Sequence, residues 1–329
     1  MSMSMSTSMF TVLPRPGSTP LDESFPALSA PSESCFTTTF GTLLPAATYL
    51  ETPSGRAAYY SLPPRASNSP SERISRVLFV HGVQTPAIGL QPLANAVSSR
   101  FPHAHCVLFD LWGHGLTETP VAVHRAELFH ELILALLNDL GWSSAHFIGY
   151  SFGGSTTATF AAAHPDRVSS MVLIAPAGLL RASDFTEQQQ RYLKGGPGVE
   201  DAARDWIFEF LEGGRLVVPD AWRERVKRGE VVAEAVREWE LREHKGHIPS
   251  VVAIFRDGGV LDQHAGFAKA AASGIPCLCV LGETDDICTV DDLHQVGMHN
   301  IDVISDVGHG VVRQRVSEVA HLIEKFWRD

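Results

Sequence analysis

The chain has 329 residues and a formal net charge of −11, from 26 Lys and Arg against 37 Asp and Glu. Hydrophobic residues make up 44% of the sequence, enough for a sizeable core, which excludes wholesale disorder. The acidic balance argues against a nucleic-acid partner, because proteins that bind the phosphate backbone need clustered positive charge.

The sequence contains no run near the roughly 18 consecutive apolar residues that a membrane-spanning helix needs. Residues 1–30 also lack the charged start and apolar block of a secretory signal, so we expect a cytoplasmic protein without a membrane span. The five cysteines include no C-x-x-C pair, which favours reduced thiols. His103-x-His105 and His244-x-x-His247 have no acidic or Cys neighbours at zinc-like spacing, so we expect no metal.

The first part of the chain, residues 1–33, is rich in Ser, Met, Pro and Thr and has no periodic apolar face. This composition predicts a loose N-terminal arm whose loss is tolerated. Two short apolar segments then flank the turn sequence Thr52–Gly55, which predicts a hairpin.

A regular alternation of strand-like apolar runs and helical patterns follows. Between residues 127 and 141, apolar pairs recur every four residues and stop at Gly141, which is typical of an amphipathic helix. Strand, helix, strand in this order predicts an α/β fold with a mostly parallel, doubly wound sheet. The expected strands are 76–80, 106–110, 145–149, 170–175, 276–281 and 301–304.

One block interrupts this alternation. Of the 80 residues from 181 to 260, 28 are charged, against 35 of the other 249. The block has helical patterns, so we interpret it as an inserted helical lid over residues 179–265. The core would then consist of residues 34–178 and 266–329. We expect the large lid side chains to line a substrate pocket, namely Trp206, Phe210, Trp222 and Trp239.

The segment Gly149-Tyr150-Ser151-Phe152-Gly153 fits the pattern G-x-S-x-G. It follows an apolar run and precedes a helix of small residues, the context that holds a nucleophilic serine on a sharp turn. The segment therefore predicts that Ser151 is a nucleophile. The backbone N–H of Phe152, the next residue, would form one half of an oxyanion hole.

A serine hydroxyl needs a base to remove its proton as it attacks. His309 lies between glycines after the last expected strand, in a tight loop that can point its imidazole into a cleft. His81 ends the first parallel strand and is a second possible base, but we interpret it as shaping the loop 81–84. In that loop the N–H of Val83 would complete the oxyanion hole.

The imidazole in turn needs a carboxylate that orients it. Three acidic residues, Glu283, Asp285 and Asp286, follow the expected strand 276–281 and remain alternatives on position alone.

In order along the chain, five motifs resemble the landmarks of the α/β-hydrolase superfamily. The resemblance covers roughly residues 40–178 and 266–329 and implies the α/β-hydrolase fold with a catalytic triad of Ser151, Asp285 and His309, since the family pattern G-x-x-D puts its aspartate on Asp285. The wording of the first two motifs is similar to fungal serine hydrolases of the AB-hydrolase-1 type. The motifs are His81-Gly82, Asp110-Leu-Trp-Gly-His-Gly115, Gly149–Gly154, Gly282-Glu-Thr-Asp285 and Gly308-His309.

The sequence thus predicts a cofactor-independent serine hydrolase that forms an acyl-enzyme on Ser151. Its substrate would be an ester, lactone or thioester of a moderately large, apolar small molecule; the fungal resemblance suggests secondary metabolism. No cofactor is expected, because the chain contains neither G-x-G-x-x-G after its first parallel strand nor a P-loop.

Two alternatives remain open. The Ser-Phe-Gly-Gly elbow also resembles C–C bond hydrolases, although those typically have Asn and Trp where this chain has Tyr150 and Gly310. The second alternative is a non-catalytic receptor or interaction protein on a hydrolase scaffold, since fold alone does not prove turnover.

Overall fold

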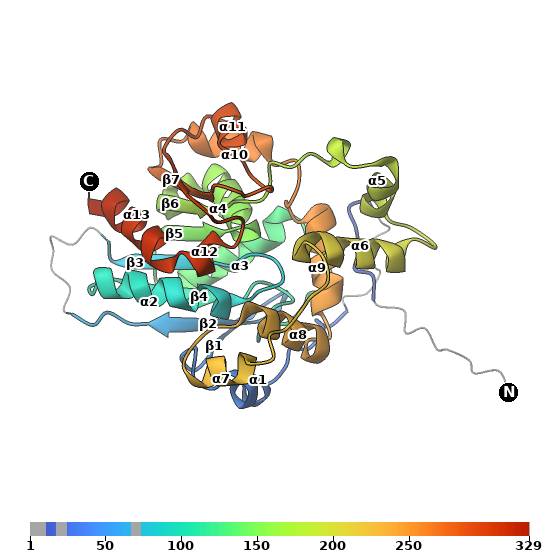
Figure 1. The fold of residues 1–329 in the computed structure, drawn as a ribbon, viewed down its shortest axis with the longest axis horizontal. Helices are drawn as coiled ribbons and strands as arrows, with labels where there is room; N and C mark the ends of the chain where they lie inside the picture. Colours follow the sequence, from blue (N-terminus) through green and yellow to red (C-terminus); the bar gives the residue numbers. More distant parts are fainter. Residues whose placement is uncertain (1–10, 18–24, 67–73, 329) are drawn as a thin grey trace.

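The structure, a computed structural model, describes residues 11–17, 25–66 and 74–328 (Figure 1). These residues form an eight-stranded sheet in the order β1-β2-β4-β3-β5-β6-β7-β8, in which β2 is antiparallel to both of its neighbours and the pairs from β4 to β8 are parallel. The strands are β1 (Thr48–Thr52), β2 (Gly55–Leu62), β3 (Arg76–Val80), β4 (His105–Phe109), β5 (Ala145–Tyr150), β6 (Val168–Ile174), β7 (Cys277–Gly282) and β8 (Ile301–Ile304).

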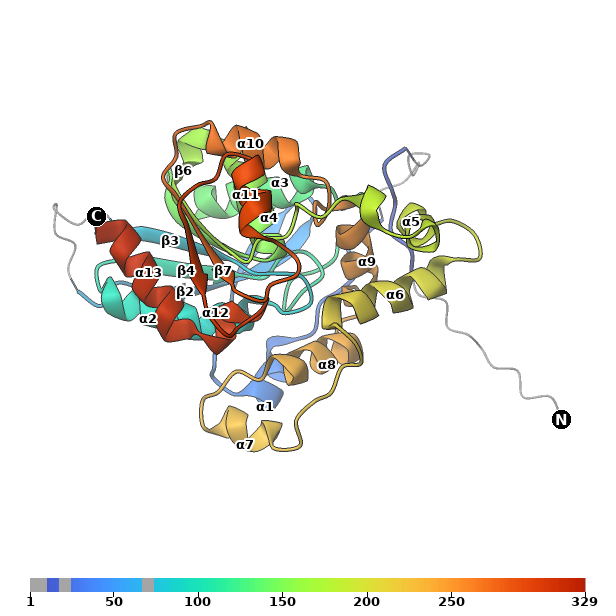
Figure 2. The same ribbon diagram turned by 45° about the horizontal axis from the view of Figure 1, so that its top comes forward.

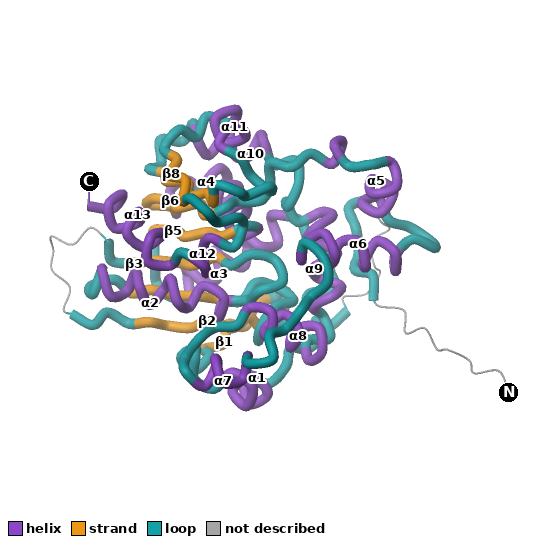
Figure 3. Tube along the Cα trace, viewed as in Figure 1, coloured by secondary structure: helices purple, strands orange, loops and turns teal. Residues whose placement is uncertain are grey.

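Helices cover both faces of the sheet, as the colours of Figure 3 show. Alternate side chains of β3 explain why both faces are covered. Leu78 and Val80 pack into one core cluster, whereas Val77 and Phe79 pack into the other, and all four are fully buried. The doubly wound α/β prediction is therefore confirmed.

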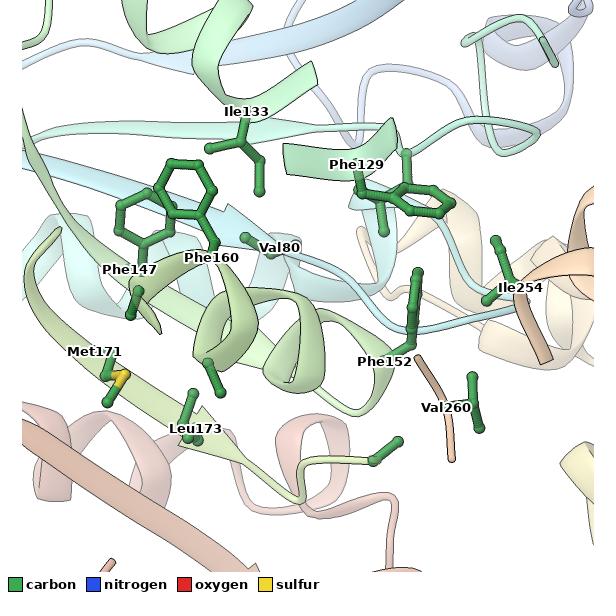
Figure 4. Close-up of a cluster of buried hydrophobic side chains, with 14 of the residues drawn as sticks. Val80, Phe129, Ile133, Phe147, Phe152, Phe160, Met171, Leu173, Ile254 and Val260 are labelled. Carbon is green, nitrogen blue, oxygen red and sulfur yellow. The ribbon is translucent and has the colours of Figure 1, made fainter. Parts of the chain in front are cut away.

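The first cluster lies between the sheet and the helices α3 (Ala126–Asp139), α4 (Phe152–Ala163) and α10 (His264–Ala271). Figure 4 shows Phe147 of β5 beside Phe160 of α4, and their ring centroids are 5.4 Å apart. The second cluster lies under α2 (Gln91–Arg100) and α13 (Val316–Arg328), which run side by side. Smaller helical elements are η1 (Ala87–Leu90), η2 (Pro165–Arg167), η3 (Ala182–Asp184), α11 (Val290–Gln295) and α12 (Val311–Gln314).

A helical insert follows β6, as the charged block predicts, and most of its helices lie beyond one end of the sheet (Figures 1 and 2). We call the stretch from α5 to α9 the lid. Among the described residues, no helix has the length and hydropathy to cross a membrane. The lid helices are α5 (Glu187–Lys194), α6 (Glu200–Glu212), α7 (Trp222–Lys227), α8 (Ala233–Glu243) and α9 (His247–Asp257).

The described part of the N-terminal arm differs from the expectation of a loose segment. Leu13 is buried, and the guanidinium of Arg15 makes two 2.8 Å contacts with the carboxylate of Asp257 at the end of α9. Arg15 also donates to the carbonyl oxygen of Leu193 in α5, at 2.9 Å. The buried side chain of Leu13 and the bidentate ion pair of Arg15 therefore hold residues 11–17 against the lid. Residues 1–10 and 18–24 lie outside the described part of the chain.

Candidate active site

Ser151 lies between the end of β5 and the first residue of α4, with φ 54° and ψ −120°. A positive φ is strained for serine, and the surroundings hold it in place. The N–H of Ser151 donates to the carbonyl of Ile174, and its own carbonyl accepts from Ala177. A Cβ on Gly153 would lie 2.0 Å from the carbonyl oxygen of Val80, so the turn requires glycine there.

The imidazole of His309 lies between Ser151 and Asp285. Its Nε2 is 2.9 Å from the Oγ of Ser151, and its Nδ1 is 3.2 Å from each carboxylate oxygen of Asp285. The side chain of Asp285 is only 1% exposed, whereas that of His309 is 29% exposed. Asp285 also accepts a 2.9 Å hydrogen bond from the N–H of Ile287, which fixes the carboxylate against the ring.

The other two acidic candidates lie differently. Glu283 is exposed and accepts a 3.0 Å hydrogen bond from the N–H of Asp306, so it ties down the loop that carries His309. Asp286 is exposed at the wall of the cavity, next in sequence to Asp285. Of the three carboxylates, the geometry brings that of Asp285 to the imidazole.

The two residues expected to form the oxyanion hole, Val83 and Phe152, both line the cavity that contains Ser151. Phe152 is the first residue of α4, so its N–H has no partner within the helix and points out from the positive end of the helix dipole. The loop of Val83 approaches Ser151 closely, since a Cβ on Gly82 would lie 3.0 Å from the Cβ of Ser151.

The loop that contains Val83 is held by buried polar groups to which the sequence alone assigns no role. The N–H of Gln84, which has φ 70°, donates to Nε2 of His114 at 3.2 Å. Asp110 accepts from the N–H of Ala87 at 2.9 Å and from the hydroxyl of Tyr60 at 2.7 Å. Burial raises the pKa of Asp110 to about 6.

His81 fits the interpretation as a loop-shaping residue. Its Nε2 accepts the N–H of Leu111 at 2.9 Å, and its Nδ1 is 2.6 Å from the carbonyl oxygen of Gly82. Burial lowers the pKa of His81 to about 4, which keeps the ring neutral. Both ring nitrogens are thus engaged by the backbone.

The cavity beside Ser151 has a volume of about 890 Å³. This volume is in the range of pockets for small molecules. One wall is apolar, and half of its residues come from the lid. A second wall carries the ion pair between Arg237 and Glu212, and Arg313 lies near it. The residues of the apolar wall are Leu180, Phe185, Trp206, Phe210, Leu211 and Val260.

Two of the four lid aromatics expected in the pocket lie elsewhere. Trp239 is buried against Phe36 and Phe40 of the N-terminal helix α1 (Glu33–Phe40), with ring centroids 5.5 and 5.9 Å apart. Trp222 packs on Phe40 and borders a separate surface groove. The expectation for Trp222 and Trp239 is corrected, because α1 offers an apolar surface that the lid pattern alone does not reveal.

The two pairs of aromatics lead to a prediction. Trp206→Ala should change the ratio of kcat/KM between a bulky lactone and a short acetate by about tenfold, because a wall contact acts on substrates unequally. Trp239→Ala should leave that ratio unchanged and lower stability by about 3–5 kcal/mol, as expected for a buried aromatic. Kinetics on both substrates and melting curves check this; a uniform loss in the folded Trp206 variant would contradict it.

Within the described ranges, no three His, Cys, Asp or Glu side chains group together in a way that could hold a metal ion. His244 and His247 face backbone carbonyls, those of Thr117 at 2.8 Å and Gly113 at 2.9 Å.

Comparison with known proteins agrees with the fold. A family model described as alpha/beta hydrolase fold matches residues 76–213. The structure is similar to that of the enol-lactonase from Burkholderia xenovorans LB400, with a TM-score of 0.61, 17% identity, and coverage of 86% of this chain and 100% of that chain. At this identity the likeness shows the fold alone.

The curated relatives match this chain over only part of their own lengths. The acetyltransferase component of the acetoin cleaving system from Pseudomonas putida is 28% identical over 68% of this chain and 56% of its own length. The 2-(acetamidomethylene)succinate hydrolase from Mesorhizobium japonicum is 29% identical over 46% of this chain and 54% of its own length. This chain thus spans about half the length of these two relatives. The sheet order, the turn at Ser151 and these matches show that the chain has the α/β-hydrolase fold.

Proposed function

We propose that the protein is a serine hydrolase that cleaves an ester, lactone or thioester through an acyl-enzyme on Ser151. The observation that carries this proposal is the continuous series of hydrogen bonds from Oγ of Ser151 through His309 to Asp285. A hydroxyl 2.9 Å from an imidazole nitrogen, with a buried carboxylate on the opposite nitrogen, is the arrangement that activates serine.

In the first half-reaction, Oγ of Ser151 attacks the carbonyl carbon and its proton passes to Nε2 of His309. The N–H groups of Val83 and Phe152 stabilise the oxyanion. The carbon–oxygen or carbon–sulfur bond then breaks, and the imidazolium gives its proton to the departing alkoxide or thiolate. In the second half-reaction, water attacks the acyl-enzyme and gives a proton to Nε2 of His309. The bond between the acyl carbon and Oγ then breaks, the imidazolium returns that proton to Oγ, and the carboxylic acid and free Ser151 are released.

The shape of the cavity supports a moderately large small molecule as substrate. Its volume of about 890 Å³ exceeds the needs of an acetate ester, and the apolar wall suits a hydrocarbon part. A role in secondary metabolism fits a substrate of this size. Action in the cytoplasm fits five cysteines that form no disulfide.

A fluorophosphonate probe tests the proposal directly, because it reacts covalently with an activated serine and not with an inert scaffold. Wild-type protein should gain one probe mass, located by peptide mapping on Ser151, and Ser151→Ala should gain none. Ser155 lies one turn further along α4, where its hydroxyl donates to the carbonyl of Gly259, so Ser155→Ala is a control that should still be labelled. An unlabelled wild-type protein would favour the receptor alternative.

A further inference from the structure

The polar wall of the cavity carries two guanidinium groups, those of Arg237 and Arg313, and among the described residues only Arg237 has carboxylate partners. Nε of Arg237 lies 2.9 Å from Oε1 of Glu212, and the two side chains are 15% and 8% exposed. Burial raises the pKa of Glu212 and lowers that of Arg237, as expected when both ions leave water. The two charges of this pair neutralise each other. Among the described residues that line the cavity, Glu212 is the carboxylate that is well shielded from solvent, and it is already paired with Arg237.

Arg313 is the second guanidinium on this wall. It comes from α12, four residues after His309, and lies over the ring of Tyr150 with its central carbon 5.4 Å from the ring centroid. The hydroxyl of Tyr150 donates to the carbonyl oxygen of His309 at 3.1 Å, so this stack adjoins the catalytic histidine. Among the described residues, no carboxylate lies within ion-pair distance of Arg313.

The remaining charged residues of the cavity do not neutralise Arg313. Asp184, Glu209 and Asp286 are exposed, as is Arg181, so water and salt screen their charges. Arg237 also lies 3.7 Å from the half-buried carboxylate of Glu234, so its charge is matched, whereas Arg313 is a half-buried cation of the cavity wall without a carboxylate partner among the described residues. A guanidinium that is partly removed from water without an anionic partner is costly, and a bound anion would offset that cost.

We propose that Arg313 binds a carboxylate group of the substrate. The planar guanidinium presents two parallel N–H donors, which match the two oxygens of a carboxylate. The apolar wall of Phe185, Trp206 and Phe210 would hold the hydrocarbon part. The substrate is then amphipathic rather than purely apolar. This inference deepens the proposed function and concerns the same cavity.

A pair of esters that differ in one group tests the proposal by kinetics. Mono-4-nitrophenyl adipate carries a terminal carboxylate on the same six-carbon chain as neutral 4-nitrophenyl hexanoate. Arg313→Gln should lower kcat/KM for the adipate ester about tenfold or more, mainly through KM, and change that for the hexanoate ester less than about threefold. Arg313→Lys should keep part of the preference, because it retains the charge and loses the fork.

Arg223 provides the matched control variant. Its guanidinium also lies over an aromatic ring, 4.5 Å from the centroid of Trp222, but it borders the groove outside the cavity. Arg223→Gln removes the same charge from the same kind of stack and should leave both esters unaffected. An equal loss on both esters for Arg313→Gln in a protein that melts normally would overturn the proposal.

A binding measurement separates this inference from the proposed function, because it needs no turnover. Calorimetry on the Ser151→Ala protein compares 6-phenylhexanoate with its uncharged amide. The acid should bind at least about tenfold more tightly, and Arg313→Gln on this background should remove the difference. If the acid binds no better than the amide, the carboxylate site is wrong; if this preference is present but the fluorophosphonate does not label Ser151, the site stands and the hydrolase proposal fails.

Discussion

Ser151→Ala and His309→Ala should each lower kcat by about 10⁴- to 10⁶-fold on any ester that the wild-type protein hydrolyses, while the fold stays intact. The physical reason is that the two side chains act as one unit. Without the imidazole, Oγ of Ser151 keeps its proton, and without Oγ the imidazole has no proton to remove across the 2.9 Å contact. Initial rates with a 4-nitrophenyl ester measure the loss.

The double variant gives this prediction its sharpest form. If the residues act as a unit, Ser151→Ala combined with His309→Ala should be no slower than either single variant. Melting temperatures close to wild type would show that the loss is chemical. Activity of Ser151→Ala within about tenfold of wild type would mean that another group performs the attack.

Asp285→Asn should lower kcat by roughly 10²- to 10⁴-fold, and Asp286→Asn should lower it only a few-fold. The carboxylate of Asp285 faces Nδ1 of His309 at 3.2 Å, which keeps the proton on Nδ1 and leaves Nε2 free to accept the serine proton. An amide can donate to Nδ1 and so favours the wrong tautomer. Asp286 is exposed and gives no such orientation.

The pH dependence of kcat for both asparagine variants distinguishes the outcomes. Comparable large losses in both variants would show that the two carboxylates act together on the imidazole. The reverse ranking would move the orienting role to Asp286 and contradict the geometry. Glu283→Gln serves as a third comparison, since Glu283 contacts the N–H of Asp306 rather than the imidazole.

The positions of the strands along the chain and the place of the serine could be predicted because their signals are local. Buried parallel strands appear as short apolar runs, and the observed bounds agree with the predicted ones to within two residues. The turn at Ser151 needs glycine at 149 and 153 because neighbouring backbone fills the space of a Cβ. Such steric needs leave a direct mark on the sequence.

The lid was harder to predict, because a helical pattern shows that a face is apolar without showing what covers it. Trp206 in α6 faces the cavity, whereas Trp239 in α8 faces α1, a partner about 200 residues away in the chain. The sequence gives no signal for a role of Arg313, for a related reason. It lies on a helix of four residues, too short for a recognisable pattern, and only the tertiary fold brings it over Tyr150.

The contact between Arg15 and the lid has a thermodynamic consequence. Arg15 joins the end of α9, through Asp257, to the end of α5, through the carbonyl of Leu193. Coupling free energies are reciprocal, so a ligand that favours this arrangement of α5 and α9 must equally favour the docked state of residues 11–17. For such a ligand, binding in the cavity should protect a peptide bond near Leu13 from cleavage by a protease, although this bond is far from Ser151 in sequence.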